Sequence, residues 1–184
     1  MNATTRRAVF LDRDGVINRA CVRDGKPYPP DSLEQLEILP EVPAALERLR
    51  KGGFLNVVVT NQPDVATGKQ RREAVEAMHS WMLKNLQIDA IKVCYHAGAD
   101  RCACRKPRPG MLLEAAQELG IDLARSLLVG DRWRDIGAGQ AAGCEKNYFI
   151  DYGYAEKRPE KPYVAVKSLP EAAALILASA NTFR

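Results

Sequence analysis

The chain has little of what marks several classes of protein. It holds two histidines among its 184 residues, and its apolar runs, such as residues 54–60, are far shorter than the about 20 residues that a membrane helix needs. Its first residues lack the long apolar stretch and the small-residue cleavage site of a signal peptide. These absences predict a cytoplasmic protein that has no membrane partner.

An excess of one charge sign is also small. The chain has 27 Lys and Arg against 23 Asp and Glu, a net charge of +4, which does not point to a nucleic-acid partner but suits an anionic substrate. The sequence lacks a GxxxxGK[ST] loop and a GxSxG elbow, so neither P-loop nucleotide chemistry nor the serine chemistry of that elbow is expected. With so few histidines, carboxylates must carry the acid–base work.

The bulk composition is that of a folded domain. Apolar residues make up 46% and charged residues 27%, close to the averages of soluble globular proteins. The length suits one compact domain with a real core, so we expect residues 1–184 to fold as a single unit. In a reducing compartment, the five cysteines are expected to be thiols or metal ligands rather than disulfides.

Short β-branched runs alternate with longer helical patterns. Strands are predicted at 8–11, 54–60, 91–95, 126–129 and 148–150, and helices at 43–51, 69–86, 109–119, 135–142 and 169–178. This alternation predicts an α/β fold, a Rossmann-like three-layer αβα sandwich around a mostly parallel sheet. Residues 18–40 and 151–166 are irregular, and the first stretch is too long for a simple connection.

Ligands of such sheets bind at the carboxyl ends of the strands. Asp12 and Asp14 follow the first run, and side chains two positions apart point to the same side. Two close carboxylates repel unless a cation lies between them or one holds a proton. The pair therefore suits a nucleophile with a proton donor, or a magnesium site, and a solvated turn is the alternative.

Other polar residues follow later runs. Thr60, Asn61 and Gln62 leave the second run together and can donate to an oxyanion or a phosphate, or cap a helix instead. Asp131 follows the fourth run, where a metal ligand is expected. Asp135 lies four residues later, and one helical turn would bring it to the same side, although it could simply be a helix N-terminal charge.

A cluster of soft ligands follows the third run. Four of the chain's seven Cys and His residues fall within eleven positions, namely Cys94, His96, Cys102 and Cys104. Three thiolates and an imidazole make a closed tetrahedral zinc site, which predicts a structural zinc ion in a loop at about 94–104; incidental thiols are the alternative. Arg105 and Lys106 come directly after this loop, and two fixed cations suit a phosphate group.

The order of these signals resembles the haloacid dehalogenase (HAD) superfamily of phosphohydrolases. FLDRDGVIN, VVVTNQ, CRKPRPGM and LVGDRWRDIGAG are similar to its four motifs, from Val9 to about Gly143. The pattern CxH…CxCRKPxPG resembles the subgroup of the D-glycero-D-manno-heptose-1,7-bisphosphate 7-phosphatases and histidinol-phosphate phosphatases. No long insertion separates the motifs, so the resemblance implies a HAD-like fold without a large cap domain.

The resemblance implies roles for these residues. Asp12 would attack phosphorus and form an aspartyl phosphate, and Asp14 would act as acid and then as base. Thr60 and Lys106 would hold the phosphoryl oxygens. Magnesium would be held by Asp12, the Asp14 backbone carbonyl and Asp131, and zinc by the four soft ligands. The resemblance also implies that the substrate is contacted by Arg13, Asn61, Gln62 and Arg105. Additional site residues would be Arg132 and Asp135.

The expected partner is a small phosphorylated sugar, with heptose 1,7-bisphosphate as the leading substrate of a monomeric enzyme. Two stretches depart from the heptose phosphatase pattern: Pro63 and Asp64 replace Ser-Gly, and residues 19–22 keep only Val22 of an Asp-x-x-Tyr-Val segment. Histidinol phosphate or another small ester is therefore an alternative substrate. A polynucleotide 3′-phosphatase and a non-catalytic phosphate-sensing module are more distant alternatives. His79 is assigned to a surface or packing position.

Overall fold

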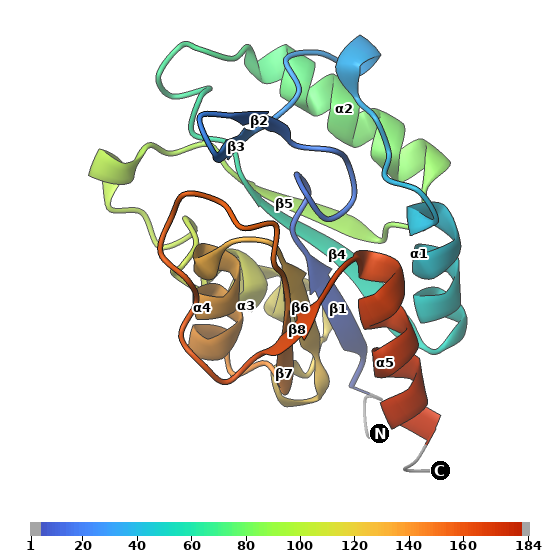
Figure 1. The fold of residues 1–184 in the computed structure, drawn as a ribbon. Helices are drawn as coiled ribbons and strands as arrows, with labels where there is room; N and C mark the ends of the chain where they lie inside the picture. Colours follow the sequence, from blue (N-terminus) through green and yellow to red (C-terminus); the bar gives the residue numbers. More distant parts are fainter. Residues whose placement is uncertain (1–4, 182–184) are drawn as a thin grey trace.

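The computed structural model describes residues 5–181, which form a parallel sheet between layers of helices (Figure 1). The six strands are β1 (Arg7–Leu11), β4 (Phe54–Asn61), β5 (Ala90–Cys94), β6 (Leu127–Gly130), β7 (Lys146–Ile150) and β8 (Val164–Val166). Their order across the sheet is β5-β4-β1-β6-β7-β8. All neighbouring pairs are parallel, so the carboxyl ends of β4, β1 and β6 lie side by side.

Helices cover both faces of the sheet. They are α1 (Val42–Lys51), α2 (Arg72–Asn85), α3 (Gly110–Leu119), α4 (Trp133–Ala142) and α5 (Leu169–Asn181), with short 3-10 turns at Leu33–Gln35, Gly98–Asp100 and Leu123–Arg125. One core cluster joins Leu46 of α1 and Ile176 of α5 to the sheet, and the other joins Met111 of α3 and Ile136 of α4 to its opposite face (Figure 1). The predicted three-layer αβα sandwich is confirmed.

The two irregular stretches hold structure that the hydrophobic pattern did not predict. β2 (Cys21–Arg23) and β3 (Lys26–Tyr28) form an antiparallel hairpin whose turn residues, Asp24 and Gly25, both have positive φ. An Asp-Gly pair favours such a turn, but three-residue strands are too short to show alternation. β8 lies in the second stretch. Between β1 and α1 the chain adds only this hairpin and the first 3-10 turn.

Helix α2 begins at Arg72 and not at residue 69, because the backbone amides of Lys69 and Gln70 both donate to the Asp64 carbonyl and close a loop there. None of the helices found between residues 5 and 181 combines the length and the apolar character that crossing a membrane requires.

Candidate active site

The predicted site residues converge on a cleft at the carboxyl edge of the sheet. The cleft has a volume of about 150 Å³, and its lining includes Asp12, Asp14, Thr60, Asn61, Arg105, Lys106, Arg132 and Asp135. Pro27 and Tyr28 of the hairpin line another part of it, and Arg134 of α4 adds a further cation. The adjacency of β4, β1 and β6 brings segments that lie 48 to 119 positions apart in the chain into one site.

Lys106 lies at the centre of this site. Its ammonium is 2.8 Å from Asp12 Oδ1 and 2.6 Å from Asp135 Oδ1, and it donates to the Val59 carbonyl oxygen at 2.6 Å. Asp135 is fixed because its other oxygen accepts the Arg132 backbone N–H at the start of α4. Burial alone would lower the pKa of Lys106, but the charges of the two carboxylates raise it, so the amine stays protonated.

The carboxylates outnumber the cation that they share. Asp12, Asp131 and Asp135 have ligand oxygens within 4.8 Å of one another. Burial and the charge of Asp135 raise the pKa of Asp12 to about 6, and burial and Asp12 raise the pKa of Asp131 well above its ordinary value. Asp131 Oδ2 accepts from the Tyr154 hydroxyl at 2.8 Å, whereas its Oδ1 is buried without a hydrogen-bond partner. This excess of oxygen ligands and negative charge fits a divalent cation such as Mg²⁺.

Asp14 is held by a different set of donors. Arg13 Nη2 donates to both of its oxygens, at 2.9 and 3.0 Å, and the Asn18 and Gln62 amides each donate at 2.9 Å. Burial alone would raise the pKa of Asp14, but the Arg13 charge and these hydrogen bonds lower it below its ordinary value. Asp14 is therefore ionised and rigidly oriented in the substrate-free protein.

Two residues that are expected to contact the substrate are buried beside the cleft and do not line it. Arg13 is fully buried and its guanidinium faces Asp14 and His79. Gln62 is also buried and donates to Asp14 and to Thr60 Oγ1. Both residues therefore donate to groups that line the cleft, and their substrate contacts stay predictions.

The other two expected contacts line the cleft. Asn61 pairs both amide atoms with the Lys106 backbone, each at 3.1 Å, so it fixes the segment that carries the lysine. Arg105 donates to the His96 carbonyl oxygen at 3.2 Å and so ties the cleft to the cysteine-rich loop. Their substrate contacts stay predictions.

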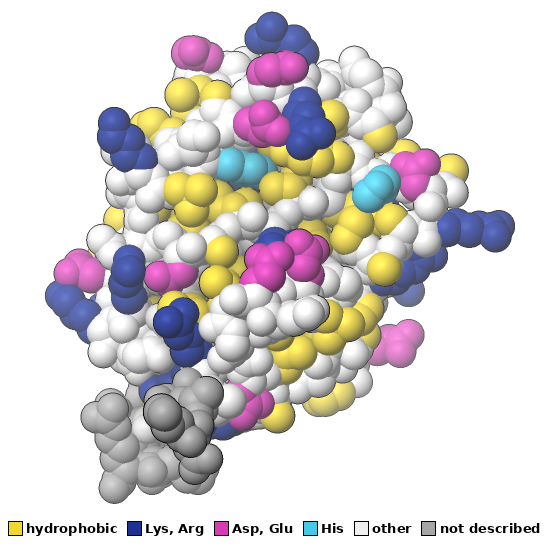
Figure 2. All heavy atoms as spheres, turned by 180° about the vertical axis from the view of Figure 1, so that it is seen from behind, with side chains coloured by type: hydrophobic (Ala, Val, Ile, Leu, Met, Phe, Trp, Pro, Cys, Tyr) yellow, Lys and Arg dark blue, Asp and Glu magenta, His cyan; other side chains and the backbone are white. Residues whose placement is uncertain are grey.

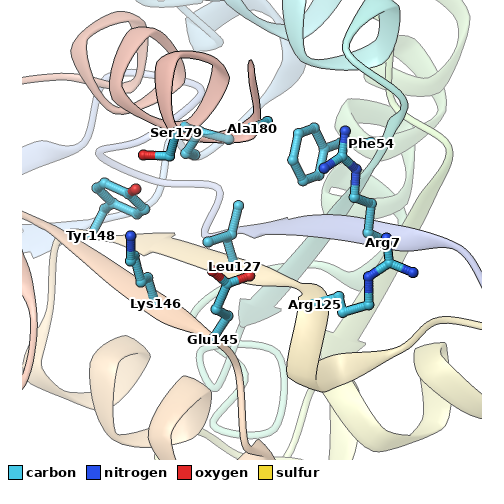
Figure 3. A pocket seen from close by; sticks show the side chains of 10 residues that line it. Arg7, Phe54, Arg125, Leu127, Glu145, Lys146, Tyr148, Ser179 and Ala180 are labelled. Atoms are coloured by element: carbon cyan, nitrogen blue, oxygen red, sulfur yellow. The ribbon is translucent and has the colours of Figure 1, made fainter. Parts of the chain in front are cut away.

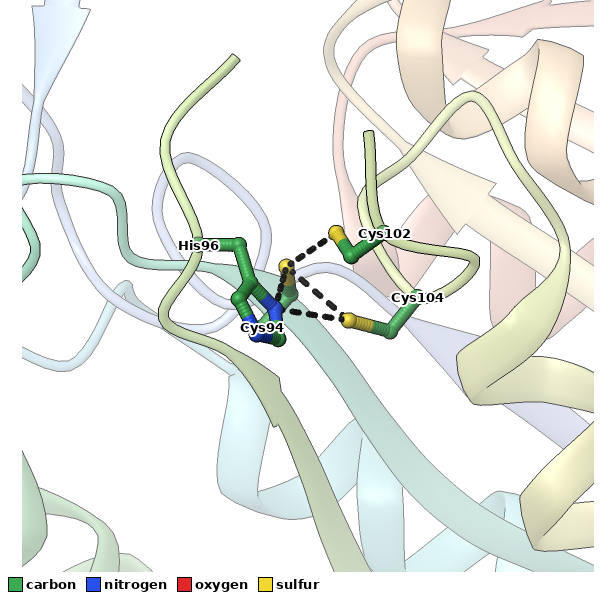
Figure 4. Close-up of side chains that lie close together, drawn as sticks. All are labelled: Cys94, His96, Cys102 and Cys104. Carbon is green, nitrogen blue, oxygen red and sulfur yellow. Dashed lines mark hydrogen bonds between the residues drawn. The ribbon is translucent and has the colours of Figure 1, made fainter. Parts of the chain in front are cut away.

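The cysteine-rich loop brings its four soft side chains together (Figure 4). Cys94 Sγ lies 3.7 Å from Cys102 Sγ and 3.2 Å from Cys104 Sγ, and His96 Nδ1 lies 3.6 Å from Cys94 Sγ and 3.2 Å from Cys104 Sγ. Tetrahedral zinc with bonds of about 2.3 Å separates sulfur ligands by about 3.8 Å, so the cluster fits this ion. Burial raises the pKa of the Cys94 thiol to about 12, and a cation is needed to make it a thiolate.

The start of α3 requires glycine next to this loop. A Cβ at Gly110 would lie 2.5 Å from the Ala103 carbonyl oxygen, and the Gly110 backbone N–H donates to the same oxygen at 3.1 Å. The loop therefore packs directly on the helix that follows Lys106.

Several residues of the site were missed from the sequence. Tyr152 and Tyr154 follow β7, so the rule of strand ends could have found them; the Tyr152 hydroxyl donates to the Gly15 carbonyl oxygen at 2.9 Å. Glu156 accepts from Arg132 Nε at 3.1 Å and partly neutralises this edge of the cleft. His79, assigned to a surface or packing position, is buried and contacts Arg13.

A second cavity lies at the opposite end of the sheet. It has a volume of about 220 Å³, and Figure 3 shows its lining from Arg7, Phe54, Leu127 and Lys146, which stand at the amino ends of four strands. Its charged residues lack the paired carboxylates of the first cleft. The candidate active site is therefore the cleft at the carboxyl edge of the sheet.

Known proteins resemble the chain over most of its length. The family model described as HAD-hydrolase-like matches residues 103–172. D-glycero-β-D-manno-heptose-1,7-bisphosphate 7-phosphatase of Vibrio cholerae is 40% identical over 79% of this chain and 82% of its own, and the Escherichia coli K12 enzyme of the same name is 39% identical over 79% and 80%.

Solved structures agree with these relatives. The D,D-heptose 1,7-bisphosphate phosphatase of B. bronchiseptica, solved with magnesium and phosphate, superposes with a TM-score of 0.81 at 31% identity, over 94% of this chain and 99% of that one. The motifs, the fold and these likenesses together place the chain in the heptose-1,7-bisphosphate 7-phosphatase family of HAD-like hydrolases.

Proposed function

We propose that this chain is a magnesium-dependent phosphatase that removes the 7-phosphate of D-glycero-β-D-manno-heptose 1,7-bisphosphate through an aspartyl phosphate. One observation carries the mechanism: Asp12 lines the cleft beside the Lys106 ammonium, with an unpartnered oxygen of Asp131 close by. The names of the relatives support the substrate.

In the first step, the Asp12 carboxylate attacks phosphorus and the bond from phosphorus to the sugar oxygen breaks. Lys106, charged throughout, and Thr60 hold the phosphoryl oxygens. Asp12, Asp131 and the Asp14 backbone carbonyl would hold magnesium, which would supply further positive charge against the anionic phosphate. Asp14 gives a proton to the departing sugar oxygen, and the negative charge of a bound phosphate favours the protonated state of Asp14 that this requires.

In the second step, Asp14 takes a proton from water, and the oxygen of that water attacks phosphorus and releases Asp12. Asp14 is now needed as a carboxylate, which is the state that its hydrogen bonds from Asn18 and Gln62 stabilise. The covalent intermediate divides one difficult hydrolysis into two easier steps.

The charged rim of the cleft suits a second anionic group. Arg105, Arg132 and Arg134 all line the cleft, and burial, followed by the positive charges of Arg132 and Arg105, lowers the pKa of Arg134. Guanidinium groups bind phosphate through two parallel hydrogen bonds. A bisphosphate supplies the second anion that such a rim can hold.

The remaining features complete this proposal. Zinc bound by the four soft ligands would order the loop that carries Arg105 and Lys106. A single domain that works as a monomer stays part of this proposal. Cysteines that serve as zinc ligands would suit a cytoplasmic enzyme. On the face shown in Figure 2, acidic and basic side chains are interspersed, unlike a basic surface for nucleic acid.

The substrate is tested by comparing kcat/KM for phosphate release from both anomers of heptose 1,7-bisphosphate and from histidinol phosphate, with magnesium present. We expect the β anomer to be preferred, at about 10⁴ M⁻¹s⁻¹ or more. A higher value on histidinol phosphate would refute the substrate and keep the phosphatase chemistry. Phosphate release from none of these, with a stable aspartyl phosphate, would favour the phosphate-sensing alternative.

A further inference from the structure

His79 is a buried titratable group for which the proposed mechanism has no use. It lies on α2 among Val75, Met78 and Met82, whose spacing marks the buried face of this helix. Its neighbours on that face are apolar, and an apolar residue would fill the position as well. A buried imidazole at this place therefore needs an explanation in terms of a polar partner.

That partner is the side chain of Arg13. Arg13 Nη1 lies 2.9 Å from His79 Nε2, and the same guanidinium donates through Nη2 to both oxygens of Asp14 and through Nε to Oδ1 at 3.2 Å. A guanidinium only donates, so His79 Nε2 must accept and the ring must be neutral, with its proton on Nδ1. Burial and the charge of Arg13 agree, because both lower the pKa of His79, to about 3.

The geometry points to His79 as a positioning residue for the acid–base step: by accepting from Arg13 Nη1, it fixes the guanidinium in the orientation that holds both oxygens of Asp14. Arg13 is fully buried, so it has no water to turn toward. In the described part of the chain, Nη1 has His79 as its acceptor, while Nη2 and Nε face Asp14. Without that acceptor the buried Nη1 is left without a hydrogen-bond partner, which destabilises this orientation of the guanidinium and weakens its contact with both oxygens of Asp14.

This inference rests on the proposed function, in which Asp14 protonates the leaving sugar oxygen. Its consequence is selective for the leaving group. A sugar alkoxide needs the proton, whereas the nitrophenolate leaving from p-nitrophenyl phosphate is a weak base and needs none. The ratio kcat/KM reports steps up to the formation of the aspartyl phosphate, so it isolates the step in which Asp14 acts as an acid.

The test compares His79→Leu, which removes the acceptor, with His79→Gln, whose Oε1 can accept in place of Nε2. Met82→Ala serves as a control, because it disturbs the buried face of the same helix and leaves the hydrogen bonds of Arg13 to His79 and Asp14 in place. We expect His79→Leu to lower kcat/KM on the heptose bisphosphate about 10- to 100-fold and on p-nitrophenyl phosphate less than about threefold. His79→Gln should restore most of the loss, and Met82→Ala should lower both values equally.

Equal losses on the two substrates in His79→Leu, or no recovery in His79→Gln, would overturn the inference and leave His79 a packing residue. Circular dichroism at the assay temperature confirms that each variant is folded. If the proposed function is wrong, the result is different, because the unmodified enzyme itself would then release no phosphate from the heptose bisphosphate. In that case any sugar phosphate that the enzyme does hydrolyse provides the alkoxide leaving group, and the same ratio decides about His79.

Discussion

Replacing Lys106 by methionine removes the cation at the centre of the site and keeps its volume. Asp12 and Asp135 then lose an ammonium at 2.8 and 2.6 Å, and both carboxylates stay buried. Breaking a buried ion pair costs about 3–5 kcal/mol of unfolding free energy, because a charge is left without compensation. In a domain of this size, 1 kcal/mol shifts Tm by about 2–4 °C, so metal-free Lys106→Met should melt on the order of 10 °C lower at about pH 8.

The loss should be smaller at about pH 5. Asp12 already has a pKa of about 6 beside the lysine, and removing the lysine raises this pKa further. At pH 5 the Asp12 carboxyl is then neutral, so no uncompensated charge remains on it. Turnover should fall about 100-fold or more at every pH, since a group that stabilises phosphoryl oxygens is gone.

A matched control exists on the surface. Lys92 makes ion pairs of 2.9 and 2.6 Å with Glu114 and Glu118, but these side chains are 56% and 53% exposed. Lys92→Met should therefore cost about 1 kcal/mol or less. Thermal melts of both variants, followed by circular dichroism without metal, give the comparison. Equal Tm losses in the two, or near-normal turnover in Lys106→Met, would refute the role given to Lys106.

Three further predictions concern the metals. Cys102→Ser should bind no zinc by atomic absorption and should melt below the unmodified protein; full zinc content would contradict the site. Tyr154→Phe should raise the magnesium concentration for half-maximal activity about 10-fold, because Asp131 loses its donor; an unchanged value would leave Tyr154 without this role. Metal-free stability should fall as pH rises through about 6, because folded Asp12 keeps its proton above its ordinary 3.8 and unfolding releases it. In thermal melts between about pH 5 and pH 8, saturating magnesium should remove this fall in stability. A fall that persists with magnesium would contradict the assignment of Asp12 as a metal ligand.

The sequence predicts the frame of the fold because buried parallel strands are runs of apolar residues. The runs that became β1, β4 and β6 placed Asp12, Thr60 and Asp131 at one edge, and strand adjacency then brought them together. The β2–β3 hairpin was not predicted, because its strands have three residues each.

The direction of Arg13 was within reach of the same reasoning. Asp12 and Asp14 both line the cleft, and a residue between two that face one side of an extended segment faces the other. The partner of His79 was out of reach, because Arg13 lies 66 positions away and only packing of α2 brings the two together.

The most direct test of the mechanism is the mass of the enzyme quenched in acid during turnover of heptose 1,7-bisphosphate. The account predicts the added mass of one phosphoryl group on the peptide that contains Asp12, and neither that adduct nor phosphate release in Asp12→Asn. Turnover in a folded Asp12→Asn variant, or a phosphoryl group on another residue, would contradict it.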